Sequence, residues 1–235
     1  MKRAHQQPMR RIRHALIISN TYYTPSAATL PPLPNGDANY TQMKEYAQAR
    51  GFDSQVSGFC STLGQLHLII QRFAELLRAT PDGDVCLFYF SGYGARIGGR
   101  NLIMSDDGKY LDLESEYLAL LDPSLHRSHI LVLDCVAPPG VGYSGAFAFS
   151  APPLNCFLMD VVMDDYGDDD DASDALNTRH RYNHCSPMTN LLVQSATAAQ
   201  LPVEQLAKVI RVKLSNEEPY QCAFATSTLM CKVML

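Results

Sequence analysis

Two short segments follow apolar runs in this chain, and each carries residue types that can take part in catalysis. Ser-Gly-Tyr-Gly at 91–94 follows the apolar run 85–90, and Asp-Cys-Val at 134–136 follows the apolar run 130–133. A thiol becomes a nucleophile when a neighbouring base removes its proton. Tyrosine, with a reference pKa of about 10, donates hydrogen bonds but is almost never that base near neutral pH. The two segments thus combine a thiol with a poor proton acceptor.

The pattern of apolar residues predicts the elements that would position both segments. Nearly continuous apolar runs indicate strands covered on both faces, and apolar residues at helical spacing indicate helices. Strands are predicted at 12–20, 53–59, 85–90, 130–134, 155–162 and 221–235, and helices at 38–50, 63–80, 113–121, 188–194 and 203–214. This alternation is typical of an α/β domain with a mainly parallel sheet.

Ligand sites in such sheets lie beyond the carboxyl ends of the strands. Both segments lie at such ends, so they would face each other across a crevice if their strands are neighbours. Successive side chains of a strand point to opposite faces. This predicts that Asp134 and Val136 share the crevice side, while Cys135 points into the packing below.

The segment at 91–94 resembles the Ser-Gly-His-Gly signature of the caspase-like cysteine peptidases, with tyrosine in place of histidine. The similarity runs from about His14 to Leu235. Its further matches are the strand 14–20, Asp37 at a helix start, Arg-Gly-Phe at 50–52, Asp-Cys-Val for the Asp-x-Cys of metacaspases and paracaspases, Ser-Pro-Met-Thr at 186–189 and Glu-Pro-Tyr at 218–220. The resemblance implies a caspase-like (caspase-hemoglobinase) α/β fold, with a mainly parallel six-stranded sheet flanked by helices on both faces.

In that family the histidine is the base for a cysteine thiolate, and the following glycine offers its N–H to the oxyanion. The resemblance assigns these positions to Tyr93, Val136 and Gly94. Valine has no nucleophilic atom and tyrosine is a poor base, so both dyad positions are substituted. We therefore predict a catalytically inactive domain of the metacaspase and paracaspase branch, which regulates proteolysis or cell death by binding a partner or a basic peptide.

The alternative is an active cysteine endopeptidase that cleaves after Arg or Lys, with Cys135 as a displaced nucleophile. Burial argues against it, because apolar surroundings raise the pKa of a thiol, but a local bulge would turn Cys135 round. A third interpretation is a purely structural interaction domain, in which Asp37 and Asp134 do not affect partner binding.

Asp37 and Asp134 match two acidic positions that line a pocket for arginine or lysine in metacaspases and paracaspases. A pair of carboxylates would bind a guanidinium through charge-assisted hydrogen bonds. The alternatives are an N-cap of the helix 38–50 for Asp37 and a solvated strand-end charge for Asp134.

Aspartates cluster between residues 163 and 185, where like charge opposes packing and predicts a solvated loop insertion. The spacing is not that of an EF-hand. Several metacaspases bind calcium through aspartates, so the resemblance also suggests Ca²⁺ ligands, although we predict no required cofactor. The candidates are Asp164, Asp165, Asp168 and Asp169. His180, His184 and Cys185 fit part of a zinc site, but without a paired cysteine motif an ordinary loop is favoured.

Composition limits the cellular location and the classes of partner that are compatible with the chain. Seven cysteines, mostly in apolar runs, indicate buried thiols in a reducing compartment, so we predict a cytoplasmic location. No apolar stretch approaches the roughly 20 residues that span a bilayer. The net charge of −5 and the lack of a basic face with aromatics argue against nucleic acid.

We predict a basic, solvated N-terminal tail at 1–13 and a single domain at 14–235. The stretch 228–235 resembles the strand through which caspases and paracaspases dimerise. An exposed edge strand invites such pairing. We therefore predict a homodimer, or a heterodimer with an active homologue.

Overall fold

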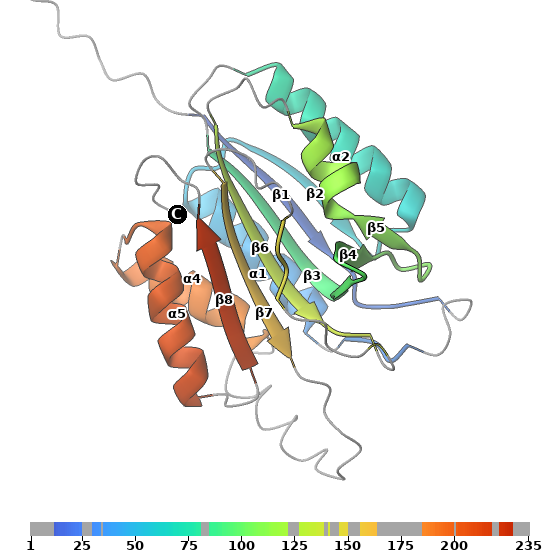
Figure 1. Ribbon diagram of the computed structural model, residues 1–235. Helices are drawn as coiled ribbons and strands as arrows, with labels where there is room; N and C mark the ends of the chain where they lie inside the picture. Colours follow the sequence, from blue (N-terminus) through green and yellow to red (C-terminus); the bar gives the residue numbers. More distant parts are fainter. Residues whose placement is uncertain are drawn as a thin grey trace, which may run out of the picture.

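The apolar runs of the sequence form a central sheet with helices on both of its faces, as the computed structural model shows (Figure 1). The structure describes residues 12–24, 30–33, 35–80, 85–121, 127–138, 141, 146–149, 156–163, 185–199, 201–217 and 221–227. Most of the predicted N-terminal tail, most of the aspartate-rich insertion and the stretch 228–235 lie outside these residues.

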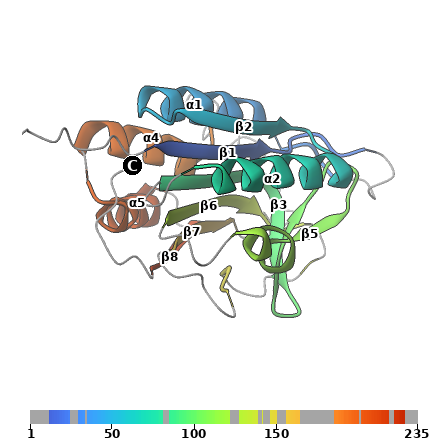
Figure 2. The same ribbon diagram turned by 90° about the horizontal axis from the view of Figure 1, so that it is seen from above.

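The main path of the sheet runs in the order β2-β1-β3-β6-β7-β8 (Figure 2). Its strands are β1 (Arg13–Ser19), β2 (Ser54–Phe59), β3 (Val85–Ile97), β6 (Ser128–Val136), β7 (Cys156–Met163) and β8 (Gln221–Ser227). All neighbours on this path are parallel except β7 and β8. The predicted α/β fold with a mainly parallel sheet is therefore confirmed, and the six predicted strands form the main path of a sheet of eight. Two short strands extend it, because β3 runs on to pair with β4 (Arg100–Met104), which pairs with β5 (Tyr110–Asp112).

The helices cover the sheet in two groups (Figure 1). One face carries α1 (Gly36–Ala49), α4 (Pro187–Ala199) and α5 (Val203–Glu217), and the other carries α2 (Leu63–Arg78) with the short helices η1 (Leu113–Tyr117) and η2 (Leu118–Leu120). Alternation along β3 supplies both cores: Leu87 and Tyr89 belong to the α1 side, and Phe88 and Phe90 to the α2 side.

Helix α1 begins earlier than predicted, and this corrects the role of Asp37. The N-cap is Asn35, whose side chain makes no capping hydrogen bond, and Asp37 lies exposed in the first turn. Gly36 allows this start, because a Cβ there would lie 1.9 Å from Thr21 Oγ1. The prediction of Asp37 as N-cap is therefore wrong, although a carboxylate in the first turn still interacts favourably with the helix dipole.

Loops at the carboxyl edge of the sheet are tied together by Asn20, which is fully buried. Its Nδ2 donates to the carbonyl of Met104 (2.8 Å), and its Oδ1 accepts from the amide of Ser61 (3.0 Å). Its own amide donates to the carbonyl of Ser91 at 2.9 Å. One amide side chain and its backbone thus join the ends of β1 and β4 and the middle of β3 to the start of α2.

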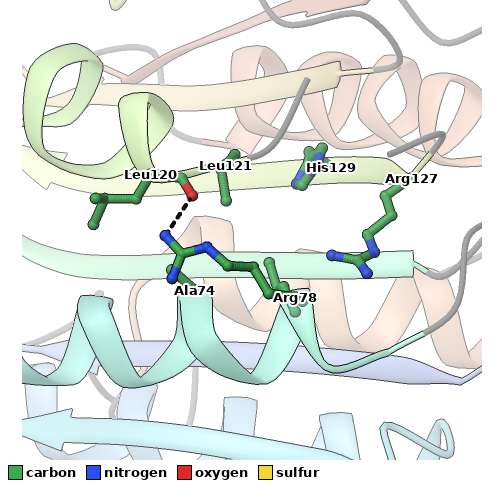
Figure 3. Close-up of a pocket in the computed structure, with 7 residues that line it drawn as sticks. Ala74, Arg78, Leu120, Leu121, Arg127 and His129 are labelled. Carbon is green, nitrogen blue, oxygen red and sulfur yellow. Dashed lines mark hydrogen bonds between the residues drawn. The ribbon is translucent and has the colours of Figure 1, made fainter. Parts of the chain in front are cut away.

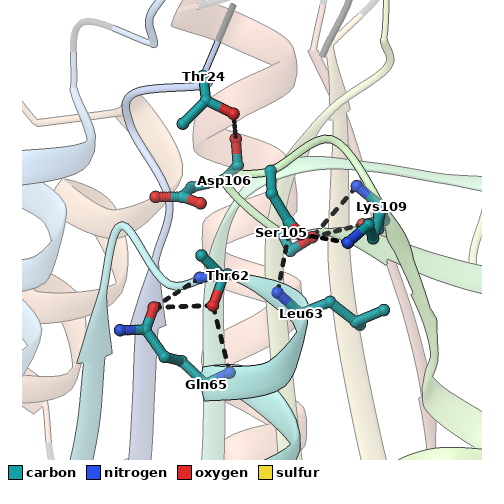
Figure 4. Close-up of polar contacts among 8 residues, drawn as sticks. Thr24, Thr62, Leu63, Gln65, Ser105, Asp106 and Lys109 are labelled. Carbon is teal, nitrogen blue, oxygen red and sulfur yellow. Dashed lines mark hydrogen bonds and ion pairs between the residues drawn. The ribbon is translucent and has the colours of Figure 1, made fainter. Parts of the chain in front are cut away.

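The start of α2 is fixed by a capping box, shown in Figure 4. The Thr62 hydroxyl accepts from the amide of Gln65, and the Gln65 side chain accepts from the amide of Thr62 at 2.8 Å. The turn after β4 adds a second contact, because Asp107 accepts from the amide of Leu63 at 2.9 Å and pairs with Lys109 at 2.8 Å. These bonds hold the pKa of Asp107 well below its usual range.

Candidate active site

The two segments singled out in the sequence lie side by side at the carboxyl edge of the sheet. Strands β3 and β6 are parallel neighbours, and their register pairs Ser91 with Asp134 and Tyr93 with Val136. In-register residues on parallel strands point to the same face. The expected facing of the two segments is therefore confirmed.

Tyr93 is buried, with 2% of its surface exposed, and both ends of the residue are held. Its hydroxyl donates to the carbonyl of Pro31 (3.0 Å), and its amide donates to the hydroxyl of Tyr23 (2.9 Å). The rings of Tyr23 and Tyr93 pack with centroids 4.9 Å apart. Burial raises the pKa of Tyr23 well above its usual range. Tyr93 therefore fastens the segments around residues 23 and 31 to β3.

Replacing Tyr93 by phenylalanine tests this fastening. The change keeps the ring contact with Tyr23 and removes the hydrogen bond to Pro31. We expect the free energy of unfolding to fall by about 1 kcal/mol, the usual net value of one hydrogen bond. Urea unfolding of the two proteins measures the difference. An unchanged stability would show that the hydroxyl contributes nothing to holding this segment.

Val136 is the last residue of β6 and is partly exposed. It offers only methyl groups beside Tyr93, so this pair of positions holds neither a nucleophile nor a base. The chemistry available at the pair is hydrogen bonding and apolar contact.

Cys135 lies on the opposite face of β6 from Asp134, in the apolar cluster on the α2 side with Phe90 and Phe147. Only 2% of its surface is exposed. Its Sγ lies beneath Gly94, where a Cβ would come within 2.8 Å of the sulfur and 3.1 Å of the Leu102 carbonyl oxygen. The predicted burial of this thiol is confirmed, and β6 shows no bulge in its register with β3.

The close contact between Gly94 and Cys135 gives a second prediction. We expect Gly94→Ala to destabilise the protein by about 1–3 kcal/mol, the usual cost of overpacking. The loss should shrink when Cys135→Ala removes the sulfur, leaving the contact with Leu102. Thermal unfolding of both single variants and the double variant gives the coupling energy. Strictly additive effects would contradict this placement of the thiol.

Asp134 is the centre of a buried polar network that joins α1, β3, β6 and α4. Its Oδ2 accepts from the hydroxyl of Ser186, from Thr189 Oγ1 at 2.6 Å, from Asn39 Nδ2 at 3.2 Å and, more weakly, from the hydroxyl of Tyr89 at 3.4 Å. Asn39 also donates to Ser91 Oγ and accepts from the amide of Ser186. Burial raises the pKa of Asp134, although the hydrogen bonds from Ser186 and Thr189 oppose the rise.

Comparison with known proteins agrees with this architecture. Residues 12–200 match a family model described as Caspase domain. The chain belongs to the caspase-domain family. Among solved structures, one titled "structure of pro-sf-caspase-1" has a TM-score of 0.69 over 98% of this chain and 97% of that chain, at 11% sequence identity. That likeness shows the fold. No curated protein matches this chain.

The caspase-domain resemblance of the sequence gave a pocket role to Asp37 and Asp134, and the two aspartates differ in their exposure. Asp134 is buried at the end of β6, whereas Asp37 is exposed on the first turn of α1. All four donors to Asp134 are neutral groups. Among the residues that the structure describes, no cationic side chain forms an ion pair with Asp134.

Several residues that shape this caspase-domain site were missed in the sequence. Asn39 lies on the buried face of α1 with Met43 and Tyr46, at the spacing i, i+4, i+7. That helical spacing places the amide of Asn39 on an otherwise apolar helix face. This was the signal in the sequence that could have indicated a buried polar contact there. The partners of Tyr93 had no such signal, because Tyr23 and Pro31 lie in a proline-rich loop without periodicity.

The predicted metal ligands fall largely outside the described residues. Asp164, Asp165, Asp168, Asp169, His180 and His184 belong to the undescribed stretch 164–184. Cys185 is described and buried, and burial raises the pKa of its thiol to about 12. Within the described ranges, no group of three or more His, Cys, Asp or Glu side chains is placed to hold a metal ion. No described helix is long and apolar enough to cross a membrane.

Proposed function

We propose that this chain is a pseudopeptidase of the metacaspase and paracaspase type, which has lost cysteine-peptidase chemistry and regulates proteolysis or cell death through binding. The observation that carries the proposal is the in-register pair of Tyr93 and Val136 at the position of the dyad. Val136 supplies no nucleophile. The hydroxyl of Tyr93 is buried and already donates to Pro31.

The alternative nucleophile, Cys135, is poorly placed for attack. A substrate carbonyl would have to reach a thiol covered by Gly94 and surrounded by apolar side chains of the α2 side. Thiolates form readily in electropositive, partly exposed surroundings, and apolar burial opposes them.

Binding of a basic peptide is supported by the charge of Asp134. The carboxylate is ionised at neutral pH only at a desolvation cost, and its four donors are neutral. A guanidinium or ammonium at the crevice would gain from this charge, and Asp37 adds a second carboxylate at the start of α1. Dimerisation through the stretch 228–235, Ca²⁺ binding at the aspartate-rich insertion and a cytoplasmic location remain parts of the proposal.

A peptidase assay tests the proposal. Fluorogenic peptides ending in Arg, Lys or Asp, with and without Ca²⁺, should give no turnover above the blank. An active homologue assayed in parallel is the positive control, and we expect a rate at least about 10⁴-fold below it, because nucleophile and base are both lost. Turnover that Cys135→Ala abolishes would replace the proposal with the displaced-nucleophile mechanism.

A further inference from the structure

The two oxygens of the Asp134 carboxylate have different surroundings. Thr189 Oγ1 donates to Oδ2 at 2.6 Å, and Asn39 Nδ2 donates to the same atom at 3.2 Å. The hydroxyls of Ser186 and Tyr89 donate to Oδ2 as well. An oxygen with two lone pairs cannot accept a further strong hydrogen bond in addition to these. Among the residues that the structure describes, none donates to Oδ1. Oδ1 is therefore the oxygen that can accept from a ligand in the crevice.

The donors to Oδ2 also fix the orientation of the carboxylate. Asn39 belongs to α1 and Tyr89 to β3. Ser186 and Thr189 lie at the start of α4. Turning the carboxylate so that both oxygens face a ligand would break bonds to all three elements, and buried donors without an acceptor are costly. A ligand therefore meets one oxygen of Asp134.

The positive charges beside the other end of β6 are too distant to pair with this oxygen. Arg78, Arg127 and His129 line a small pocket at the amino end of the sheet. There Arg78 donates to the carbonyl of Leu120 at 3.3 Å (Figure 3). His129 and Asp134 are five residues apart on β6, which is about 17 Å along a strand. These side chains therefore do not pair with Oδ1.

A single acceptor oxygen distinguishes the two basic side chains. A guanidinium binds a carboxylate most strongly through two parallel N–H···O bonds, one to each oxygen. It also brings five N–H groups that need acceptors when it is buried. An ammonium is a compact charge with three N–H groups, and a bond to one oxygen suffices to hold it. At Asp134 a guanidinium would lose its second bond and leave more donors without acceptors.

We propose that the crevice selects lysine over arginine in the basic peptide that it binds, through a hydrogen bond from the ammonium to Asp134 Oδ1. The inference rests on the proposed function, in which the crevice binds a basic peptide, and it adds which basic side chain is bound. It does not depend on the loss of peptidase chemistry, because a substrate would meet the same oxygen.

NMR titration of the ¹⁵N-labelled protein tests this selection. The probes are acetylated tetrapeptide amides with three alanines followed by lysine, arginine or trimethyllysine. A pH of about 8 favours the ionised carboxylate, whose pKa is raised by burial, and leaves lysine charged. The lysine peptide should bind about tenfold more tightly than the arginine peptide, because the arginine forfeits one hydrogen bond. Trimethyllysine keeps the charge but has no N–H group, so its peptide should also bind about tenfold more weakly.

Two variants show whether Asp134 is the group that binds the peptides. Asp134→Asn keeps an acceptor for the four donors, so the variant should fold, and it places the amide nitrogen where Oδ1 stood. It should weaken binding of the lysine peptide at least about tenfold. Glu45→Gln is the matched control, because Glu45 is an exposed carboxylate of α1, and it should leave the Kd unchanged.

The outcomes separate this inference from the function on which it rests. Binding of neither peptide, or binding that Asp134→Asn leaves unchanged, would contradict the basic-peptide site itself. Binding through Asp134 with arginine as tight as lysine would overturn the selection alone. Equal affinity for lysine and trimethyllysine would do the same, because it would show that charge without a hydrogen bond is sufficient.

Discussion

Asp134→Ala is expected to lower the free energy of unfolding by about 3 kcal/mol, because the change leaves buried donors of Ser186, Thr189 and Asn39 without their acceptor. Each such donor costs about 1–3 kcal/mol when stranded, but the two hydroxyls can rotate toward other acceptors, and one uncompensated buried charge disappears. We expect a smaller loss for Asp134→Asn, whose amide oxygen still accepts. For a chain of this length, the Ala variant should unfold about 6–12 °C lower.

The matched control is Asp37→Ala, which removes an exposed carboxylate from the first turn of α1. Its loss should stay below about 1 kcal/mol, the usual range of a charge–dipole contact. Chemical unfolding of the three variants separates a structural carboxylate from a surface one. Equal losses for Asp134→Ala and Asp37→Ala would contradict the buried network.

The same network predicts a pH dependence with a definite sign. Because burial raises the pKa of Asp134 in the folded state, the folded protein binds this proton more tightly than the unfolded chain. The contribution of Asp134 to stability is therefore fully present below the unfolded pKa of about 3.9 and is lost as pH rises through the folded pKa. The stability of the wild type relative to Asp134→Asn should therefore fall as pH rises across this window.

Reintroducing the dyad should restore thiol activation before it restores cleavage. With Val136→Cys alone, we expect a thiol with an ordinary pKa of about 8.5, and with Tyr93→His added, a pKa of about 6.5. At pH 6 the thiolate fraction would rise from about 0.3% to about 24%, while the lower basicity would cost about eightfold in nucleophilicity. The rate of alkylation at position 136 should thus rise about tenfold.

Mass spectrometry of the peptide that contains position 136 measures this rate with iodoacetamide. The matched control combines Val136→Cys with Tyr93→Phe, which also removes the hydroxyl contact to Pro31 but supplies no base. Circular dichroism verifies the fold of each variant, because Tyr93 is buried. Equal rates with histidine and phenylalanine at position 93 would show that the crevice no longer has the geometry of a dyad.

The sequence was informative where periodicity and register act over short distances. Apolar runs located β1, β3 and β6, and the alternation of side chains separated Cys135 from Asp134. The same reasoning failed for contacts made across the fold. The bond between Tyr93 and Pro31 spans 62 residues, and that between Asn39 and Asp134 spans 95. No local pattern encodes such pairs.

The start of α1 shows a different limit of prediction. Asp37 is a good N-cap residue type, but the close approach of Gly36 to Thr21 places the helix start before it. A tertiary contact thus overrode a local preference. The pocket role of Asp37 and Asp134 was inferred from motif positions alone, and the structure added that Asp134 is buried while Asp37 is exposed.

The tie made by Asn20 bears on how such a chain can arise. Asn20 holds the crevice loops through bonds to backbone groups of Met104, Ser61 and Ser91, and its own carbonyl accepts from the hydroxyl of Tyr23. None of these bonds uses the side chain at position 93 or 136. This part of the framework therefore does not depend on the side chains at positions 93 and 136, whereas the segment around Pro31 is also held by the Tyr93 hydroxyl. Under the proposed function, such a framework would let catalytic side chains be lost one at a time while the fold is preserved.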